Sequence, residues 1–320
     1  MADAAETDEQ HLERIYGLKF PQEFYEFIKF YNDNAELRDN ANVEVWPTGP
    51  FDMITDPGAV NGEHPLWDAR YYDDPPEFLT FARGGCDGLH WGLYVDDPAQ
   101  PPFHVAYFYS RDAFEIHTCG STMFEFFRNQ VEETHVQLKE SSEDGGVDEE
   151  DYQEGLEQLA RLRAAFPASK TGDRPEVGSE YLDKYCDSHE RETVAPTRDE
   201  IGIVIPEEKY VALSGRDVFL SGNKPFTAEE VGAWEKEAMD LLERGYPGAA
   251  LKLGKDLWIF RDYRETSYSL LDAAYTALDR PLLRNLLKDA IAYRAHCDVE
   301  NEKRDAARKA QVEMLDELSG

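Results

Sequence analysis

The first half of the chain changes from helical to strand-like hydrophobic spacing. Residues 9–33 carry apolar side chains at helical intervals, which predicts a core helix, and Pro21 suits a first helical turn. Four short runs rich in β-branched and aromatic residues follow, separated by Gly, Pro and Asp. These runs cover residues 43–47, 78–82, 89–95 and 103–109. Their order predicts an antiparallel sheet flanked by helices.

The middle of the chain is polar and rich in acidic residues. A helical pattern over 121–138 leads into the segment 140–151, where seven of twelve residues are carboxylates and two are glycines. This composition is typical of a flexible, solvated junction. A short helix near 151–166 and a second polar stretch over 169–181 follow. We interpret the second stretch as the connection between two domains and expect the boundary between about 140 and 195.

The second half is dominated by helical spacing. The β-branched run 201–206 ends in proline and predicts a buried strand. A helix begins at the capping box formed by Thr227 and Glu230 and stops at the Gly and Pro that follow its last apolar residues. Residues 251–260 alternate around Gly254, which predicts a tight β-hairpin. The remaining chain predicts helices that end in an exposed, charged tail.

The predicted fold is α+β, with two tightly associated domains. The first is an antiparallel sheet with flanking helices, and the second is mainly helical with a short β-hairpin. The predicted segments are an acidic disordered tail over 1–10, an N-terminal α+β domain over 11–138, an acidic linker with short helices over 139–195, and a C-terminal α-rich domain over 196–320.

The composition indicates which partners the chain can bind. Its 320 residues include 66 acidic and 33 basic side chains, for a net charge of −33. Such a surface repels a nucleic-acid duplex, which carries one phosphate charge per ~1.7 Å, so we expect basic protein partners and no direct nucleic-acid binding. The N-terminus lacks the basic and apolar regions of a signal peptide, and no apolar run is long enough to span a membrane. We therefore expect a cytoplasmic protein, and a monomer is the simplest expectation for its oligomeric state.

Familiar catalytic and metal-binding motifs are absent from the sequence. The four cysteines, Cys86, Cys119, Cys186 and Cys297, lack the spacing of a zinc site or a disulfide framework, which indicates reduced thiols. The glycine-rich segment 84–88 has neither a Walker lysine nor a dinucleotide fingerprint. No G-x-S-x-G elbow is present. An independent enzyme of these classes is disfavoured, and we expect no metal or cofactor bound by the chain itself.

Several segments resemble the histone PARylation factor family. RYYDDPPEFLTF at 70–81 is similar to the family's signature, and IYGLKFPQEFYEFIKF at 15–30 resembles its N-terminal helix. GPFDMI, IGIVIP, LKLGKDLWIF and DAAYTALDRPLL follow in the family's order, whereas 136–195 matches only loosely. The signature residues are Tyr71, Tyr72, Asp74, Pro75, Pro76, Glu77 and Phe78. They could line a groove, but a Pro-Pro corner flanked by aromatic residues is more often a rigid turn.

The resemblance implies an accessory factor for an ADP-ribosyltransferase of the poly(ADP-ribose) polymerase type. Members of this family insert a glutamate beside the NAD that the polymerase binds, and the joint site modifies serine. A serine hydroxyl is a poor nucleophile near neutral pH, and a carboxylate that accepts its proton contributes ~10²–10⁴ in rate. The corresponding residue here is Glu243, if one inserted residue after Tyr246 is allowed. Glu243 lies in the last turn of its predicted helix, where the macrodipole disfavours negative charge.

This chain departs from the family pattern at the partner-binding positions. Leu242 stands where the family has an aspartate, and Asp240 is only a loose substitute one turn away. Arg216 is the nearest candidate for the family's partner-binding arginine, and Tyr246 is a further expected contact. The family's Lys-rich N-terminal extension has no counterpart, so we expect a cytoplasmic and even prokaryotic setting in which histones are not required substrates. A nuclear role in the DNA damage response is expected only for a eukaryotic source.

Two alternatives compete with this interpretation. The first half also resembles the immunity and signalling domains of the Smi1/Knr4 superfamily, which neutralise a partner through acidic surface contact without catalysis. The helices of the second half would be superfluous in such a module. The third hypothesis is a hydrolase or transferase that acts alone through paired carboxylates such as Asp240 and Glu243, but no motif supplies its substrate pocket.

Overall fold

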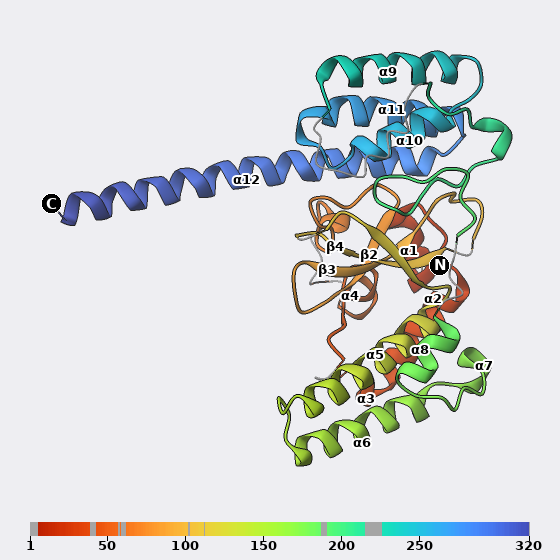
Figure 1. Cartoon of the computed structure of the whole chain (residues 1–320), viewed down its shortest axis with the longest axis vertical. Helices are drawn as coiled ribbons and strands as arrows, with labels where there is room; N and C mark the ends of the chain where they lie inside the picture. Colours follow the sequence, from red (N-terminus) through yellow and green to blue (C-terminus); the bar gives the residue numbers. More distant parts are fainter. Residues whose placement is uncertain are drawn as a thin grey trace, which may run out of the picture.

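The computed structural model arranges the chain in three tiers. Figure 1 shows C-terminal helices at one end, the β-sheet in the middle and a second helical layer at the other end. The structure describes residues 6–38, 43–56, 58, 62–101, 103–111, 113–186, 191–214 and 226–319, with side chains to 312. Within those ranges, every helix is too short or too polar to cross a membrane.

The sheet is antiparallel, as predicted, and its five strands follow chain order from β1 to β5. The predicted runs at 78–82, 89–95 and 103–109 are confirmed as β2, β3 and β4, whereas only two residues of 43–47 form a strand. The fifth strand was not predicted, since its half-buried polar residues give little hydrophobic signal. The strands are β1 (Trp46–Pro47), β2 (Phe78–Arg83), β3 (Leu89–Tyr94), β4 (His104–Tyr109) and β5 (Ile116–Gly120).

Four short α-helices precede β2 in the described part of the chain. They are α1 (Asp8–Tyr16), α2 (Gln22–Asp33), α3 (Ala35–Arg38) and α4 (Pro50–Thr55). The predicted helix over 9–33 is thus two helices. The first begins at Asp8, behind a capping box formed by Thr7 and Gln10, so part of the predicted tail over 1–10 is helical.

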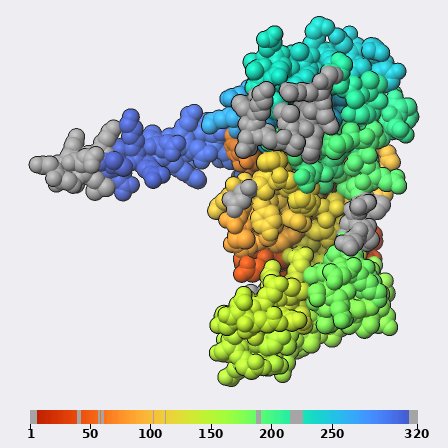
Figure 2. Space-filling view, in the orientation of Figure 1, coloured from red at the N-terminus to blue at the C-terminus, as the bar shows by residue number. Residues whose placement is uncertain are grey.

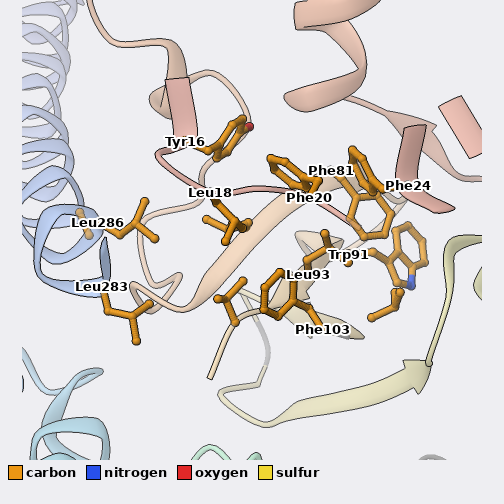
Figure 3. Close-up of a cluster of buried hydrophobic side chains, with 14 of the residues drawn as sticks. Tyr16, Leu18, Phe20, Phe24, Phe81, Trp91, Leu93, Phe103, Leu283 and Leu286 are labelled. Atoms are coloured by element: carbon orange, nitrogen blue, oxygen red, sulfur yellow. The ribbon is translucent and has the colours of Figure 1, made fainter. Parts of the chain in front are cut away.

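Both halves of the chain contribute to one hydrophobic core. Figure 3 shows Leu18 and Phe24 from the N-terminal segment, Phe81 from β2, and Leu283 and Leu286 from the C-terminal helix around a common centre. All five side chains are almost completely buried. Because burial of apolar surface is the main stabilising contribution to folding, the two halves should unfold together.

The lower tier contains α5 (Met123–Glu143), α6 (Glu149–Ala165), α7 (Ala168–Thr171) and α8 (Ser179–Tyr185). The prediction of a flexible junction over 140–151 is wrong for most of that segment, since only residues 144–148 lie between α5 and α6. Asp148 caps α6 by accepting a 3.0 Å hydrogen bond from the backbone N–H of Asp151. Acidic residues stabilise a helix at its N-terminus, so this acidic run favours a helix start.

The C-terminal tier contains α9 (Ala228–Glu243), α10 (Gly248–Leu257), α11 (Arg264–Ala277) and α12 (Pro281–Ser319). The predicted helix that begins at Thr227 is confirmed as α9, with its capping box. The second half of α12 projects from the body, and residues 301–312 are exposed, as predicted for a charged tail (Figures 1 and 2).

The predicted hairpin over 251–260 is wrong, because this segment lies largely in the buried helix α10. Gly254 does not form a turn. A Cβ atom at this position would lie 2.8 Å from Cγ of Leu271, so glycine allows α10 to approach α11 closely.

The predicted strand over 201–206 is also wrong. Ile201, Ile203 and Ile205 are buried at alternate positions, as in a strand. Among the described residues, however, the segment forms only an isolated bridge between Ala195 and Ile203. The alternating isoleucines therefore indicate an extended segment with one buried side, but this segment is not a strand of the sheet.

Arg294 of α12 connects the C-terminal helices to the family-like segment 70–81. Its Nε donates to the carbonyl of Tyr72 at 2.9 Å, and its Nη1 donates to the carbonyl of Trp258 at 3.1 Å. Its guanidinium carbon lies 3.7 Å from the centroid of the Trp258 ring. The Trp258 indole in turn donates to the carbonyl of Asp73 at 2.9 Å. The buried guanidinium of Arg294 thus links α12 to the turn before β2 and to Trp258 at the end of α10.

A second buried polar cluster joins α10 to the sheet. The ammonium of Lys255 donates to the hydroxyl of Tyr94 in β3 and lies 3.7 Å from Oδ2 of Asp199. One turn away, Lys252 donates to Oδ2 of Asp256 at 2.7 Å. Burial raises the pKa of Asp256 to about 6, although the charge and hydrogen bond of Lys252 oppose the rise.

Replacing Arg294 with methionine should destabilise the whole chain. The methionine keeps an apolar stem over Trp258 but leaves buried carbonyls without their donor, so we expect a loss of about 2–4 kcal/mol in the free energy of unfolding. Denaturant unfolding followed by tryptophan fluorescence measures this loss. The exposed Arg308→Met on the same helix is the matched control, and equal stability of the two variants would contradict the proposed linking role.

Asp256 should make stability fall as pH rises from about 4 to about 6. The folded protein binds this proton more tightly than the unfolded chain, whose aspartate has an ordinary pKa of about 3.9. The free energy of unfolding of the wild type, minus that of Asp256→Asn, should therefore decrease by up to about 3 kcal/mol over this window and then level off. Unfolding curves at several pH values test this, and a difference that rises with pH would show that the Lys252 pairing dominates.

Candidate functional site

Glu243 is the last residue of α9, and its backbone geometry is well defined. The helix ends in a Schellman motif, in which the N–H of Tyr246 donates to the carbonyl of Leu241 at 3.0 Å and that of Gly245 donates to Leu242 at 2.9 Å. Gly245 has a φ of 93°, a conformation that glycine adopts without strain. The stop signal read from the sequence therefore fixes Glu243 at the helix end.

Burial of the opposite side of α9 turns Glu243 toward solvent. Val231, Trp234, Ala238 and Leu241 pack inward on the other C-terminal helices. The α9 helix forms the outer edge of the C-terminal tier, and Figure 2 shows this tier at the molecular surface. Glu243 is exposed, and among the described residues no hydrogen bond or ion pair engages its carboxylate. The carboxylate is therefore available to another molecule.

Two charged residues share this exposed side of α9 with Glu243. Lys236 donates to Oδ2 of Asp240 at 2.7 Å, and this hydrogen bond is the main reason why the pKa of Lys236 is raised. The charge of Glu243 adds a smaller contribution to the same rise. Asp240 is thus engaged in an ion pair with a neighbouring lysine. An exposed pair of this kind does not form the enclosed site that an independent enzyme would need.

The other expected partner contacts differ in their exposure. Tyr246 is half-buried, and the Arg244 guanidinium lies 5.8 Å from the centroid of its ring. Leu242, which replaces the family's aspartate, is partly buried and packs against the hydrophobic core. Arg216 lies outside the described residues. The structure therefore brings Asp240, Glu243 and Tyr246 to one end of α9 and leaves the arginine unplaced.

The signature segment forms a buried turn between the sheet and the C-terminal helices. Asp74 is completely buried, and its Oδ2 accepts hydrogen bonds of 2.9 Å from the Tyr71 N–H and from the Thr80 hydroxyl. Its Oδ1 lies 2.7 Å from Nε2 of His90. Burial alone would raise the pKa of Asp74, but the charge and hydrogen bond of His90, followed by the Arg70 charge, lower it below its ordinary value.

The His90 ring is held on both of its nitrogens. Nδ1 lies 2.7 Å from the carbonyl of Gly88, which can only accept a hydrogen bond, so Nδ1 carries a proton. Nε2 lies 2.7 Å from Oδ1 of Asp74, so the ring is held between a carbonyl and a carboxylate. The ring also stacks on Tyr71 at 4.1 Å. These partners make the Asp74–His90 pair part of the structural frame.

The remaining signature residues lie between the sheet and the C-terminal helices. Pro75, Pro76, Glu77 and Phe78 are buried. The hydroxyl of Tyr275 in α11 donates to Oε1 of Glu77 at 2.5 Å. The guanidinium carbons of Arg264 and Arg294 lie 5.0 and 5.5 Å from the centroid of the Tyr72 ring, and the Tyr72 hydroxyl donates to Asp298 at 2.7 Å. The segment is thus enclosed by C-terminal residues and is not an open groove.

Sequence reasoning missed the buried charges of α10 because it assigned that segment to a hairpin. In a helix, the spacing of Lys252 and Asp256 predicts an i,i+4 ion pair. The pair could therefore have been predicted if the segment had been assigned to a helix. No three His, Cys, Asp or Glu side chains in the part of the chain that the structure describes are grouped to hold a metal ion.

Comparisons with known proteins agree over most of the chain. The family model of Histone PARylation factor 1 matches residues 7–224, which end just before α9. Histone PARylation factor 1 of Danio rerio is 28% identical over 122 residues, which cover 36% of this chain and 35% of that protein. The Mus musculus protein of the same name is 23% identical over 338 residues, covering 93% and 90% respectively. The chain therefore belongs to the Histone PARylation factor 1 family.

Proposed function

We propose that this protein is an accessory factor of an ADP-ribosyltransferase of the poly(ADP-ribose) polymerase type. Its family supports such a partner, and the exposed carboxylate at the end of α9 carries the proposal. A catalytic group inside a cleft can serve its own protein, whereas a carboxylate on an outer helix end can enter the cleft of another. Glu243 would then complete a site that the partner forms only in part.

The proposed chemical role of Glu243 is that of a general base toward a serine hydroxyl. The partner would hold NAD, the carboxylate would accept the serine proton, and the serine oxygen would form a bond to the ribose carbon as nicotinamide leaves. Water around an exposed carboxylate stabilises its charge and makes it a weak base. Docking would remove that water and strengthen the base, so the residue would be active only in the complex.

The neighbours of Glu243 support a docking surface at this end of α9. Asp240 and Tyr246 are proposed to contact the partner together with Arg216. The Lys236–Asp240 ion pair lies beside Glu243 and offers both signs of charge to a complementary surface. Because Leu242 packs against the core, Asp240 is the carboxylate on this exposed side that could assist Glu243.

Replacing Glu243 with glutamine should abolish serine modification without weakening the complex. The amide keeps the shape of the side chain but cannot accept the proton, so we expect a rate decrease of ~10²–10⁴. The measurement is ADP-ribosylation of serine-containing peptides by a polymerase from the same source organism with NAD, quantified by mass spectrometry. Calorimetric titration of the same two proteins measures the dissociation constant.

The matched control is Glu229→Gln, which changes an equally exposed glutamate in the first turn of the same helix. This control should behave as the wild type in both assays. If Glu243→Gln also supports serine modification at the wild-type rate, Glu243 is a surface residue. A purely binding role, as in the Smi1/Knr4 alternative, would then be favoured.

A further inference from the structure

A cavity of about 350 Å³ lies between one end of the sheet and the middle of α5. On the sheet side it is lined by Leu89 and Trp91 of β3, Tyr107 and Tyr109 of β4, and Cys119 of β5. Trp91 pairs with Tyr107 and Leu89 with Tyr109, so these side chains share one side of the sheet. The α5 side contributes Gln130, Glu133, Thr134 and Gln137, and residues 44 and 85–86 complete the rim.

The sequence of α5 explains why the space is open. Near the start of this helix, buried Phe126 fills the gap to the sheet, and its ring centroid lies 5.6 Å from that of Trp91. Beyond Val131, the sheet-facing positions are polar and do not fill the corresponding gap. The cavity thus begins where the aromatic residues of α5 end. Its sheet side is largely aromatic, and its α5 side is polar.

The walls of this cavity are negatively charged. Glu44 and Glu133 both line it, and no lysine or arginine is among its described lining residues. Desolvation raises the pKa of Glu133, while the hydrogen bond from the Gln130 amide at 2.9 Å opposes the rise. The charge of Glu133 also helps to raise the pKa values of Tyr107 and Tyr109, for which burial is the main cause. Glu133 lines the same cavity as both phenol rings.

Such walls select a cationic ligand. An anion would be repelled by two carboxylates, and the described residues offer no group of three side chains to hold a metal ion. An ammonium or guanidinium group, in contrast, gains from aromatic rings and from carboxylates at once. The volume lies at the lower end of ligand pockets, which suits a single long side chain.

We propose that this cavity binds a lysine or arginine side chain of a basic polypeptide. The net charge of −33 attracts such a polypeptide to the surface, and the cavity adds a specific position for one of its cations. The cavity is lined by strands of the sheet and by α5, and Figure 1 shows α5 and α9 at opposite ends of the molecule, so this site is separate from Glu243 and does not depend on the proposed function.

Calorimetric titration with a lysine- and arginine-rich peptide tests the proposal. A peptide of equal length with glutamine at every basic position should not bind. Tyr107→Leu and Glu133→Gln should each weaken binding roughly tenfold, whereas Tyr107→Phe keeps the ring and should bind as the wild type. The matched control for charge is Glu157→Gln, which removes an exposed carboxylate of α6.

Alkylation of Cys86 provides a second readout at the same cavity. This thiol is exposed and lies at the rim, so bound peptide should slow its alkylation while that of the half-buried Cys297 is unchanged. Should Tyr107→Leu fail to fold, Glu133→Gln and Cys86 protection still decide the question. Equal weakening by Glu133→Gln and Glu157→Gln, without protection of Cys86, would show diffuse attraction only and overturn the proposal.

Discussion

The fold depends on the buried turn over residues 70–78, which is held from both sides by polar side chains. On the sheet side, the Asp74–His90 pair fixes the turn to β3. On the helical side, Arg294 and Tyr275 bind the same turn from α12 and α11. Buried charges and hydrogen-bonding groups are costly unless each finds its partner, so these contacts specify one arrangement of the two halves.

This buried turn explains how the chain can hold the proposed catalytic carboxylate, Glu243, at a defined place on its surface. The C-terminal helices share a continuous core with the sheet, and α9 packs on their outer side. The Schellman motif fixes the backbone at the end of α9, where Glu243 lies. A rigid frame of this kind limits the entropy lost when the side chain enters a partner's site. The acidic cavity beside α5 lies in a different tier, so the two ends of the molecule can engage different molecules.

The sequence predicted those features that depend on local spacing. Three strands were recognised from short runs of β-branched and aromatic residues bounded by turn residues, and the end of α9 from Gly245 and Pro247. Features that depend on distant partners were not recognised. Ile201, Ile203 and Ile205 have strand-like spacing but form no ladder, and Gly254 packs against a helix instead of turning the chain.

The candidate site, too, could be predicted only where it depends on local sequence patterns. The position of Glu243 at a helix end follows from the sequence, and its resemblance to the family suggested its role. The contact between Lys255 and Tyr94 joins residues 161 positions apart, and no local pattern reveals it. The acidic cavity could not be predicted for the same reason. It forms where the polar residues of α5 face three strands of the sheet, and the sequence alone does not show how these elements are aligned.

The most direct test of the central claim is a structure of this chain bound to a poly(ADP-ribose) polymerase that holds an unreactive NAD analogue. We expect the end of α9 to enter the polymerase site, with the Glu243 carboxylate within about 2.6–3.2 Å of the place where an acceptor hydroxyl meets the nicotinamide ribose. A complex in which α9 faces solvent and the polymerase contacts another tier would contradict the shared-site account.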